Sequence, residues 1–309
     1  MQGAIILRGQ DMDLDLIFEG GGVLGICYVG AYQALMEKGY RVQRCAGTSV
    51  GSIMAALIVA GYAPGELFKI LRNTDFRMFM EDTSLGRFGK LGKALSVITD
   101  KGMYDSEVIE GWMESLLRKK GVAKFGHVMA NGGSRLKVVA ADITRRKMLI
   151  LPDDLSDYGI DPMNFSIARA IRMSCAIPVF YTPVTIETKP IKNFIVDGGL
   201  LSNFPIWIFD MEEKYTRPTF GIKIKDQESY TSRGKTGIIS YLKDLIYAPL
   251  NEDEENFIRN KDLLRTIVIN CDIKINFTDF DKVNRFIKDL YDSGYKYTIQ
   301  YINGLRPKV

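Results

Sequence analysis

Length, composition and charge place the chain among ordinary globular proteins. It has 309 residues, of which 46% are hydrophobic and 25% are charged, a balance that excludes disordered and fibrous classes. Forty-one basic residues against thirty-seven acidic residues give a formal charge of +4. That charge is too small and too scattered to indicate a nucleic-acid partner, although it permits a mild attraction to anionic membranes.

Cysteine usage and apolar segments bear on compartment and cofactors. The four cysteines, Cys27, Cys45, Cys175 and Cys271, form no CxxC pair, and the chain has one histidine. We therefore expect buried free thiols in a reducing compartment and no metal site. The N-terminus lacks a signal-peptide pattern, and the longest apolar stretch, 53–60, is far below the ~20 residues of a membrane span. These features predict a soluble, cytoplasmic protein that at most docks on a membrane.

The hydrophobic pattern alternates short apolar runs, glycine-containing turns and amphipathic segments, which is typical of an α/β fold. Strands are predicted at 14–18, 41–46, 136–143, 191–196, 219–224 and 266–269. Helices are predicted at 23–38, 50–60 and 165–175, with further helical segments after residue 226.

The region between Asn73 and Asp105 has a blurred pattern that mixes Met and Phe with Gly and Lys. We predict that it covers the functional site. Within it, Phe76 and Phe79 belong to a segment, 76–93, that combines apolar residues with a basic rim and so suits contact with lipid. Packing of this segment in the core is an equally good interpretation.

A GxSxG pentapeptide, Gly47 to Gly51, follows a predicted strand and opens a predicted helix. This is the context of a nucleophile elbow, in which Gly47 and Gly51 permit a sharp turn that lifts the Ser49 side chain out of the sheet. The helix N-terminus also favours a developing alkoxide. The alternative interpretation is a tight strand-to-helix turn without chemistry.

A second glycine-rich turn, GGGVLG, spans Gly20, Gly21, Gly22 and Gly25 after the first predicted strand. Its backbone amides could form an oxyanion hole. The same letters satisfy the dinucleotide-binding pattern GxGxxG, which also needs an acid at the end of the next strand. That strand ends without an acid, so the dinucleotide alternative is the weaker one.

A nucleophilic serine needs a base, and the chain offers two candidates. His127 lies in a segment without catalytic signature, so we expect a structural role for it. Asp197 ends an apolar strand and is followed by Gly198 and Gly199. Burial there would raise the carboxyl pKa and make it a better base. The alternative for Asp197 is an ordinary Asp-Gly turn.

Taken together, GGGVLG, GTSVG and DGG resemble the patatin-like phospholipases, in the family's order, and the resemblance extends through SCAIPVFYTPV and LLSNFP. It implies a three-layer α/β/α fold with a central, mostly parallel sheet. It further implies Ser49 as nucleophile, Asp197 as base and the turn at Gly20 to Gly22 as oxyanion hole, without cofactor. We expect residues 12–211 to form the catalytic domain and 212–309 to complete the same domain.

The resemblance also implies the substrate, an acyl lipid such as a phospholipid or lysophospholipid, and peripheral membrane contact. One position departs from the family, which often has Lys or Arg where this chain has Leu24. A catalytically silent lipid-binding protein is the main alternative, and the intact Ser49 and Asp197 count against it. Any need for a protein activator is left open.

Overall fold

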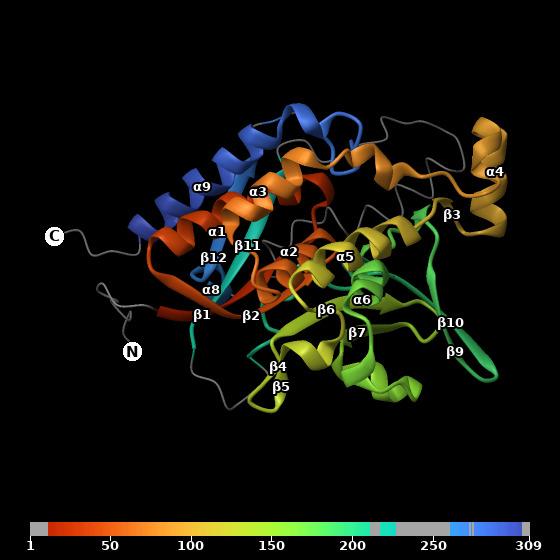
Figure 1. Ribbon diagram of the computed structural model, residues 1–309, viewed down its shortest axis with the longest axis horizontal. Coiled ribbons are helices and arrows are strands. Elements are labelled where there is room, and N and C mark those ends of the chain that lie inside the picture. Colours follow the sequence, from red (N-terminus) through yellow and green to blue (C-terminus); the bar gives the residue numbers. More distant parts are fainter. Residues whose placement is uncertain (1–11, 211–216, 227–259, 272, 274, 305–309) are drawn as a thin grey trace.

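A central sheet organises the molecule (Figure 1). The computed structural model describes residues 12–210, 217–226, 260–271, 273 and 275–304. The sheet strands are β1 (Met12–Phe18), β2 (Tyr40–Thr48), β6 (Leu136–Asp142), β7 (Lys147–Leu151), β9 (Val184–Thr188), β10 (Ile191–Asp197), β11 (Thr219–Asp226) and β12 (Thr266–Cys271). Their order is β12-β11-β1-β2-β6-β10-β9, and β7 pairs with β6.

Most of the sheet is parallel. β12, β11, β1, β2 and β6 pair in parallel, whereas β7, β9 and β10 run antiparallel to their neighbours. The α/β class and the mostly parallel sheet are therefore confirmed. All six predicted strands coincide with observed strands, while β7 and β9 were not predicted.

Helices and short elements connect the strands. The α-helices are α1 (Cys27–Glu37), α2 (Val50–Val59), α3 (Pro64–Asn73), α4 (Gly89–Thr99), α5 (Glu107–Lys119), α6 (Ile167–Cys175), α8 (Asn260–Leu263) and α9 (Ile287–Gly304). The 3-10 helices are η1 (Gly22–Ile26), η2 (Phe76–Met80), η3 (Gly86–Phe88), η4 (Phe125–Val128), η5 (Asp153–Tyr158), η6 (Pro162–Asn164), η7 (Gly198–Leu200) and η9 (Val283–Arg285). Two small sheets pair β3 (Gly102–Tyr104) with β8 (Val179–Tyr181), and β4 (Met129–Ala130) with β5 (Gly133–Ser134).

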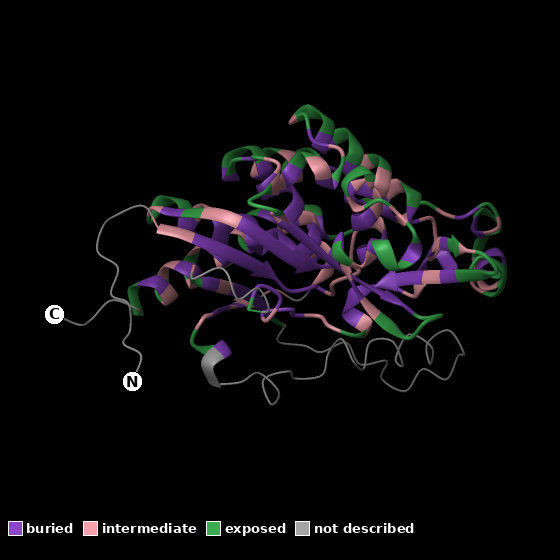
Figure 2. Cartoon of the chain, turned by 90° about the horizontal axis from the view of Figure 1, so that it is seen from below, coloured by how far each residue is buried: buried purple, intermediate pink, exposed green. Residues whose placement is uncertain are grey.

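The alternation of side chains along β1 explains how both faces of the sheet are covered. Leu14, Leu16 and Phe18 point into the larger core beneath the helices, which include α1, α2 and α6. Ile17 points to the opposite face, where the segment 204–209 covers a smaller core. The period of two residues in a strand produces this division. Figure 2 shows the sheet strands as largely buried.

The region between 73 and 105 contains η2, η3, α4 and β3. The prediction that this region covers the functional site holds for Phe76 and Phe79, which line a cavity together with Ser49. The prediction that they form an exposed lipid-contacting surface is wrong, because both are only 6% exposed. The Phe79 ring packs edge-on against Trp112 of α5, with ring centroids 5.2 Å apart. Core packing therefore describes these two residues, whereas Phe88 is 78% exposed.

The four cysteines are buried and free of disulfides, as predicted. None of the helices in the described part of the chain combines the length and apolar character needed to cross a bilayer. Among the same residues, no group of three or more His, Cys, Asp or Glu side chains is placed to hold a metal ion.

Candidate active site

Ser49 stands at the junction of β2 and α2 in a strained conformation. Its backbone has φ 53° and ψ −129°, a combination that non-glycine residues rarely adopt and that marks functional turns. The turn is tight enough that a Cβ on Gly47 would lie 2.3 Å from the carbonyl carbon of Gly51. The spacing of GxSxG thus has a steric cause, and the predicted nucleophile-elbow geometry is present.

Hydrogen bonds hold the elbow from below. The Ser49 amide donates to Ser174 Oγ at 2.9 Å, and Ser174 Oγ donates to the Val139 carbonyl at 2.6 Å. Ser52 Oγ donates to the Ser49 carbonyl at 2.6 Å. Because these bonds occupy the backbone of Ser49, its strained turn is fixed in place by α2, α6 and β6.

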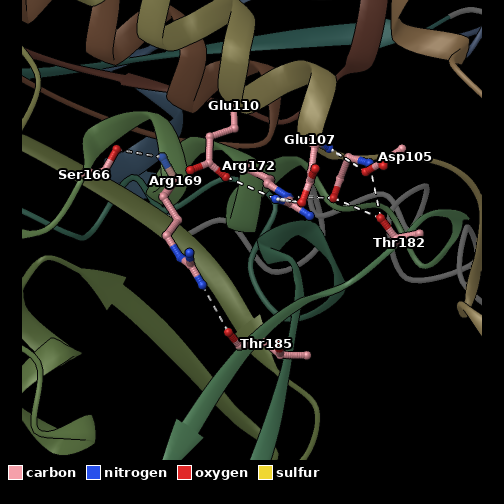
Figure 3. Close-up of polar contacts among 9 residues, drawn as sticks. Asp105, Glu107, Glu110, Ser166, Arg169, Arg172, Thr182 and Thr185 are labelled. Atoms are coloured by element: carbon pink, nitrogen blue, oxygen red, sulfur yellow. Dashed lines mark hydrogen bonds and ion pairs between the residues drawn. The ribbon is translucent and has the colours of Figure 1, made fainter. Parts of the chain in front are cut away.

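Helix α6, which carries Ser174, is itself anchored at its sides. Figure 3 shows Arg172 directed toward Glu107 and Glu110 of α5, and its Nη1 lies 3.2 Å from a carboxylate oxygen of each. Its Nε donates to Ser106 Oγ at 2.8 Å. On another side, Arg169 donates to the Thr185 carbonyl at 3.3 Å. These contacts position the helix that supports the elbow.

Asp197 ends β10 and is 3% exposed. Its Oδ1 accepts a hydrogen bond from the Gly199 amide at 2.8 Å, which is the bond of an ordinary Asp-Gly turn. Its Oδ2 is buried and accepts no hydrogen bond from the described part of the chain. The turn interpretation therefore accounts for one carboxylate oxygen and leaves the other unexplained.

Electrostatics give Asp197 the properties of a base near neutral pH. Burial raises the pKa of its carboxyl group from 3.8 to about 6, and the Ser49 hydroxyl and the Gly199 amide act in the opposite direction. The predicted upward shift by burial is confirmed. The two side chains line one cavity, although Oδ2 accepts no aligned bond in this conformation. Such looseness is common before substrate binds.

The glycine-rich turn after β1 lines the same cavity as Ser49 and Asp197. Gly22 has φ +52°, and a Cβ there would lie 2.1 Å from the Phe277 carbonyl oxygen, so the position requires glycine. The amides of Gly21 and Gly22 find no acceptor among the described residues, whereas the Gly20 amide donates to the Asn203 carbonyl at 3.0 Å. Gly25 lies within η1 and packs on Val50.

Other sequence candidates fall in expected places. His127 is exposed in η4, and its Nδ1 accepts a bond from the Ala123 amide at 3.2 Å. This is a local turn contact, consistent with the structural role predicted for it. Gly198 lies so close to β6 that a Cβ would be 2.3 Å from the Val139 carbonyl oxygen, which explains a glycine directly after Asp197.

Two cavities of different character open on Ser49. The first holds about 810 Å³ of empty space, including space open to solvent, and its wall is almost entirely apolar, with Val29, Leu67 and Trp112 among its residues. The second holds about 620 Å³ on the same measure and is more polar, with Asp197 beside the glycine-rich turn. The hydroxyl therefore stands between an apolar and a polar compartment.

Comparison with known proteins agrees with this arrangement. The family model described as patatin-like phospholipase matches residues 16–210. The chain belongs to this family. It is accordingly an ester-bond hydrolase, and lipid hydrolysis in general is its activity.

Relatives of this patatin-like phospholipase are found in bacteria and viruses. Uncharacterized protein YqhO of Bacillus subtilis (strain 168) is 41% identical over 217 residues, 70% of this chain and 73% of that protein. Probable lipid hydrolase 463L of Invertebrate iridescent virus 6 is 30% identical over 205 residues, 65% of this chain and 63% of the viral protein.

Among solved structures, VipD from Legionella pneumophila matches with a TM-score of 0.53 at 16% identity, a likeness that concerns the fold alone. The match covers 94% of this chain and 66% of VipD. This chain thus spans less than two thirds of the length of VipD and of the viral relative.

The position where the patatin-like family often has a cation lies inside the polar cavity. Leu24 is 3% exposed and lines that cavity together with Glu19 and Asn203. Glu19 is paired, because Lys223 Nζ lies 3.2 Å from its Oε1. The departure at Leu24 therefore changes the wall around the polar side of the site rather than a distant surface.

Several residues of the site were not predicted individually. Ser174 and Asn203 lie in the segments SCAIPVFYTPV and LLSNFP, which the family resemblance included without assigning roles to them. Phe277 reaches the glycine-rich turn from the C-terminal part of the chain, where its carbonyl accepts from the Val23 amide at 2.9 Å. No local motif marks that contact, since only the fold brings the two segments together.

Proposed function

We propose that the protein hydrolyses fatty acyl esters of phospholipids or lysophospholipids through a dyad of Ser49 and Asp197. The observation that carries the proposal is the buried, unpartnered Oδ2 of Asp197 beside a serine in a strained elbow. Leaving a buried carboxylate oxygen without a donor costs free energy. A role of this oxygen in accepting the Ser49 proton explains why the protein retains it despite that cost.

The chemistry follows from these positions. Ser49 Oγ attacks the ester carbonyl while Asp197 accepts its proton, and a tetrahedral intermediate forms. Collapse of the intermediate breaks the bond to the alcohol, which receives the proton from Asp197. Water then attacks the acyl-enzyme, with Asp197 as base again, and releases the fatty acid and free Ser49.

Backbone amides would stabilise the tetrahedral oxyanion. The Gly21 and Gly22 amides are the donors in the glycine-rich turn, and the Val50 amide at the start of α2 is the third. We do not include Gly20, because its amide already donates to Asn203. Fixed donors of this kind contribute several kcal/mol to the stability of the transition state.

The two cavities assign the two halves of the substrate. The acyl chain would occupy the apolar cavity, where Ile53, Leu71 and Ile177 contribute to the wall. The alcohol and head group would lie in the polar cavity near Asn203 and Leu24. Because Ser49 borders both, an ester that spans them places its carbonyl at the hydroxyl.

Residues 212–309 are proposed to complete the catalytic domain rather than form a second one. β11 and β12 extend the sheet next to β1, and α9 packs along α1. The close approach of Gly294 in α9 to the Cys27 carbonyl, where a Cβ would lie 1.8 Å from the oxygen, supports intimate packing.

Incubation of the purified protein with mixed phospholipid vesicles, followed by mass spectrometry of the products, tests the proposal. Free fatty acid and the matching lysophospholipid should appear with the wild type and not with Ser49→Ala. A fluorophosphonate probe should label wild type only. Binding of lipid without product and without labelling would favour the catalytically silent alternative.

A further inference from the structure

Helix α4 is built with its apolar side outward. Phe88, the N-cap residue at the end of η3, is 78% exposed, and Leu91, Leu95 and Ile98 of α4 are 87%, 48% and 77% exposed. Their spacing of three, four and three residues places them on one face of the helix. We call these four residues the α4 apolar face. A helix on a protein surface ordinarily turns such a face to the core.

The opposite side of α4 is small and polar, and it contacts the protein. Ser96 is fully buried, and its Oγ bonds the Gly102 carbonyl at 2.6 Å and Thr83 Oγ1 at 2.6 Å. Lys93 pairs with Asp82 at 2.7 Å. These contacts fix the orientation of the helix, so outward exposure of its apolar side is imposed by the fold.

Basic residues border the apolar face. Arg87 precedes it with a side chain that is 71% exposed, and the exposed Lys101 follows it. Lys101 Nζ lies 5.0 Å from the Phe194 ring centroid, and Lys192 Nζ lies 5.9 Å from the same centroid. Residues 86–101 contain four basic residues against one acid. Asp100 and Asp82 are the acids nearest the face in sequence, and Glu81 Oε1 lies 4.0 Å from Arg87 Nη2.

The placement of α4 in the molecule suits a peripheral contact. Figure 1 shows α4 and the β9–β10 hairpin at one end of the molecule, and Figure 2 shows that end as largely exposed. Strand β3, directly after α4, pairs with β8 at Gly102 and Val179. β8 begins two residues after Ile177, which lines both cavities at Ser49.

From these observations we propose that the α4 apolar face inserts into the surface of an anionic lipid bilayer. The apolar side chains supply the insertion, and Arg87 and Lys101 match the negative head groups. The inference rests on the proposed lipid substrate, because docking there would bring the catalytic end of the sheet to its substrate through β3 and β8.

Co-sedimentation with vesicles tests the inference. The double variant Leu91→Ser/Ile98→Ser should bind vesicles of phosphatidylcholine and phosphatidylglycerol about tenfold or more weakly than wild type. The control is Leu264→Ser, because Leu264 has the same 77% exposure as Ile98 and lies outside α4. It should bind like wild type. Equal binding of wild type and double variant would overturn the proposal.

Charge and oligomer state provide two further arms. Arg87→Gln/Lys101→Gln should weaken binding to the anionic vesicles and leave the weak binding to pure phosphatidylcholine unchanged. Wild-type binding that is equal on both vesicle types would overturn the anionic assignment. Light scattering that shows a dimer in wild type and a monomer in the double variant, with unchanged vesicle binding, would assign the face to a second copy instead.

The proposed enzymatic activity is measured separately with a short soluble ester. The double variant should hydrolyse it as wild type does, because no residue of α4 lines either cavity in the described structure. If neither protein hydrolyses any ester while wild type still binds vesicles through α4, the proposed function fails and the docking surface stands. If only the double variant loses soluble-ester hydrolysis, the substitutions have damaged the fold. The α4 apolar face would then not be a surface that is independent of the active site.

Discussion

Two glycine-rich turns meet at the candidate active site, and they use backbone strain differently. In the turn between β1 and η1, the positive φ of +52° falls on Gly22, where only a backbone amide is needed. In the turn between β2 and α2, the positive φ of 53° falls on Ser49, where a side chain is needed. The first turn is relaxed because glycine has no side chain, and the second places strain on the residue that carries the proposed nucleophilic hydroxyl.

The comparison shows how one sheet edge supplies two kinds of chemistry. Both turns follow neighbouring parallel strands, β1 and β2, so their ends lie side by side. In the proposed mechanism one turn provides donors for the oxyanion and the other provides the nucleophile, while Asp197 arrives from the antiparallel strand β10. Reactive side chains are thus few, and the rest of the site is backbone.

Removal of the nucleophile should have the largest effect. Ser49→Ala should reduce hydrolysis at least about 10⁴-fold, and Asp197→Asn should reduce it about 10²–10⁴-fold, since the amide cannot accept the Ser49 proton. His127→Ala, measured in the same ester assay, is the matched control and should retain most activity. A folded but inactive His127→Ala would replace the dyad with a Ser-His arrangement.

A change in the first turn should act through the oxyanion. Gly22→Ala forces a Cβ against the Phe277 carbonyl oxygen and should displace the amides, with a loss of turnover of about 10²-fold. Gly21→Ala is the control, because its nearest contact would be an ordinary 3.4 Å to Ile224. Thermal unfolding of both variants separates misfolding from lost catalysis. Equal turnover in the two variants would contradict the role of the Gly22 amide.

The pH dependence should report Asp197. Its pKa is raised to about 6, and only the ionised carboxylate can act as base, so turnover should fall as the pH drops through about 6. The same low-pH limb of the pH–rate profile, in which turnover falls through about pH 6, should be present in His127→Ala. If the limb disappears in that variant, the titrating group is the histidine and the assignment of Asp197 is contradicted.

Ionisation of the buried Asp197 carboxyl group should lower the stability of the folded protein. Because the folded-state pKa of about 6 exceeds the ordinary value of 3.8, the protonated form favours the fold. That contribution is complete below about pH 4 and is lost as the pH rises through about 6, on the order of 3 kcal/mol in all. Measured by urea unfolding, the free energy of unfolding of Asp197→Asn should therefore rise relative to that of the wild type between about pH 4 and about pH 8. A constant difference would contradict the buried ionisation.

The sequence predicted the parts of the fold that are determined locally. The strands that carry Ser49 and Asp197 were located to within a few residues, because apolar runs ending in Gly motifs mark them. The helix expected at 23–38 instead begins as η1 and becomes α1 at Cys27, since Val23 donates its amide to Phe277. That contact joins segments far apart in the chain, so the hydrophobic periodicity of the sequence cannot predict it.

Surface and core were harder to separate. Phe79 and Phe88 belong to one blurred segment of Met, Phe, Gly and Lys, yet Phe79 is 6% and Phe88 is 78% exposed. The difference arises because η2 packs on Trp112 while α4 turns its polar side, with Ser96, to the protein. Helical periodicity predicts which apolar residues share one face of a helix. It does not predict whether that face meets the core or the solvent.

The smallest predicted effect concerns a strained residue without a reactive side chain. Val179 has φ 66°, a conformation in which a β-branched residue is an outlier. Unlike Ser49, it has no chemical reason to carry this strain. The left-handed region costs an L-residue about 1–2 kcal/mol, and glycine gives back about 0.5–1 kcal/mol through the entropy of the unfolded chain. Val179→Gly should therefore stabilise the protein by up to about 1 kcal/mol and raise the Tm by a few degrees.

Calorimetry of Val179→Gly and Val179→Ala distinguishes relief of strain from loss of side-chain contacts. Alanine keeps a Cβ in the same backbone conformation, so it should bring no gain, while glycine should. Ester hydrolysis should persist in both, because Val179 lines neither cavity, whereas Ser49→Gly should gain stability and lose activity. A lower Tm for Val179→Gly would mean that the valine side chain stabilises the β3–β8 pair by more than its backbone strain costs. Backbone strain at Val179 would then not indicate a functional position, and Ser49 alone would connect strain with function.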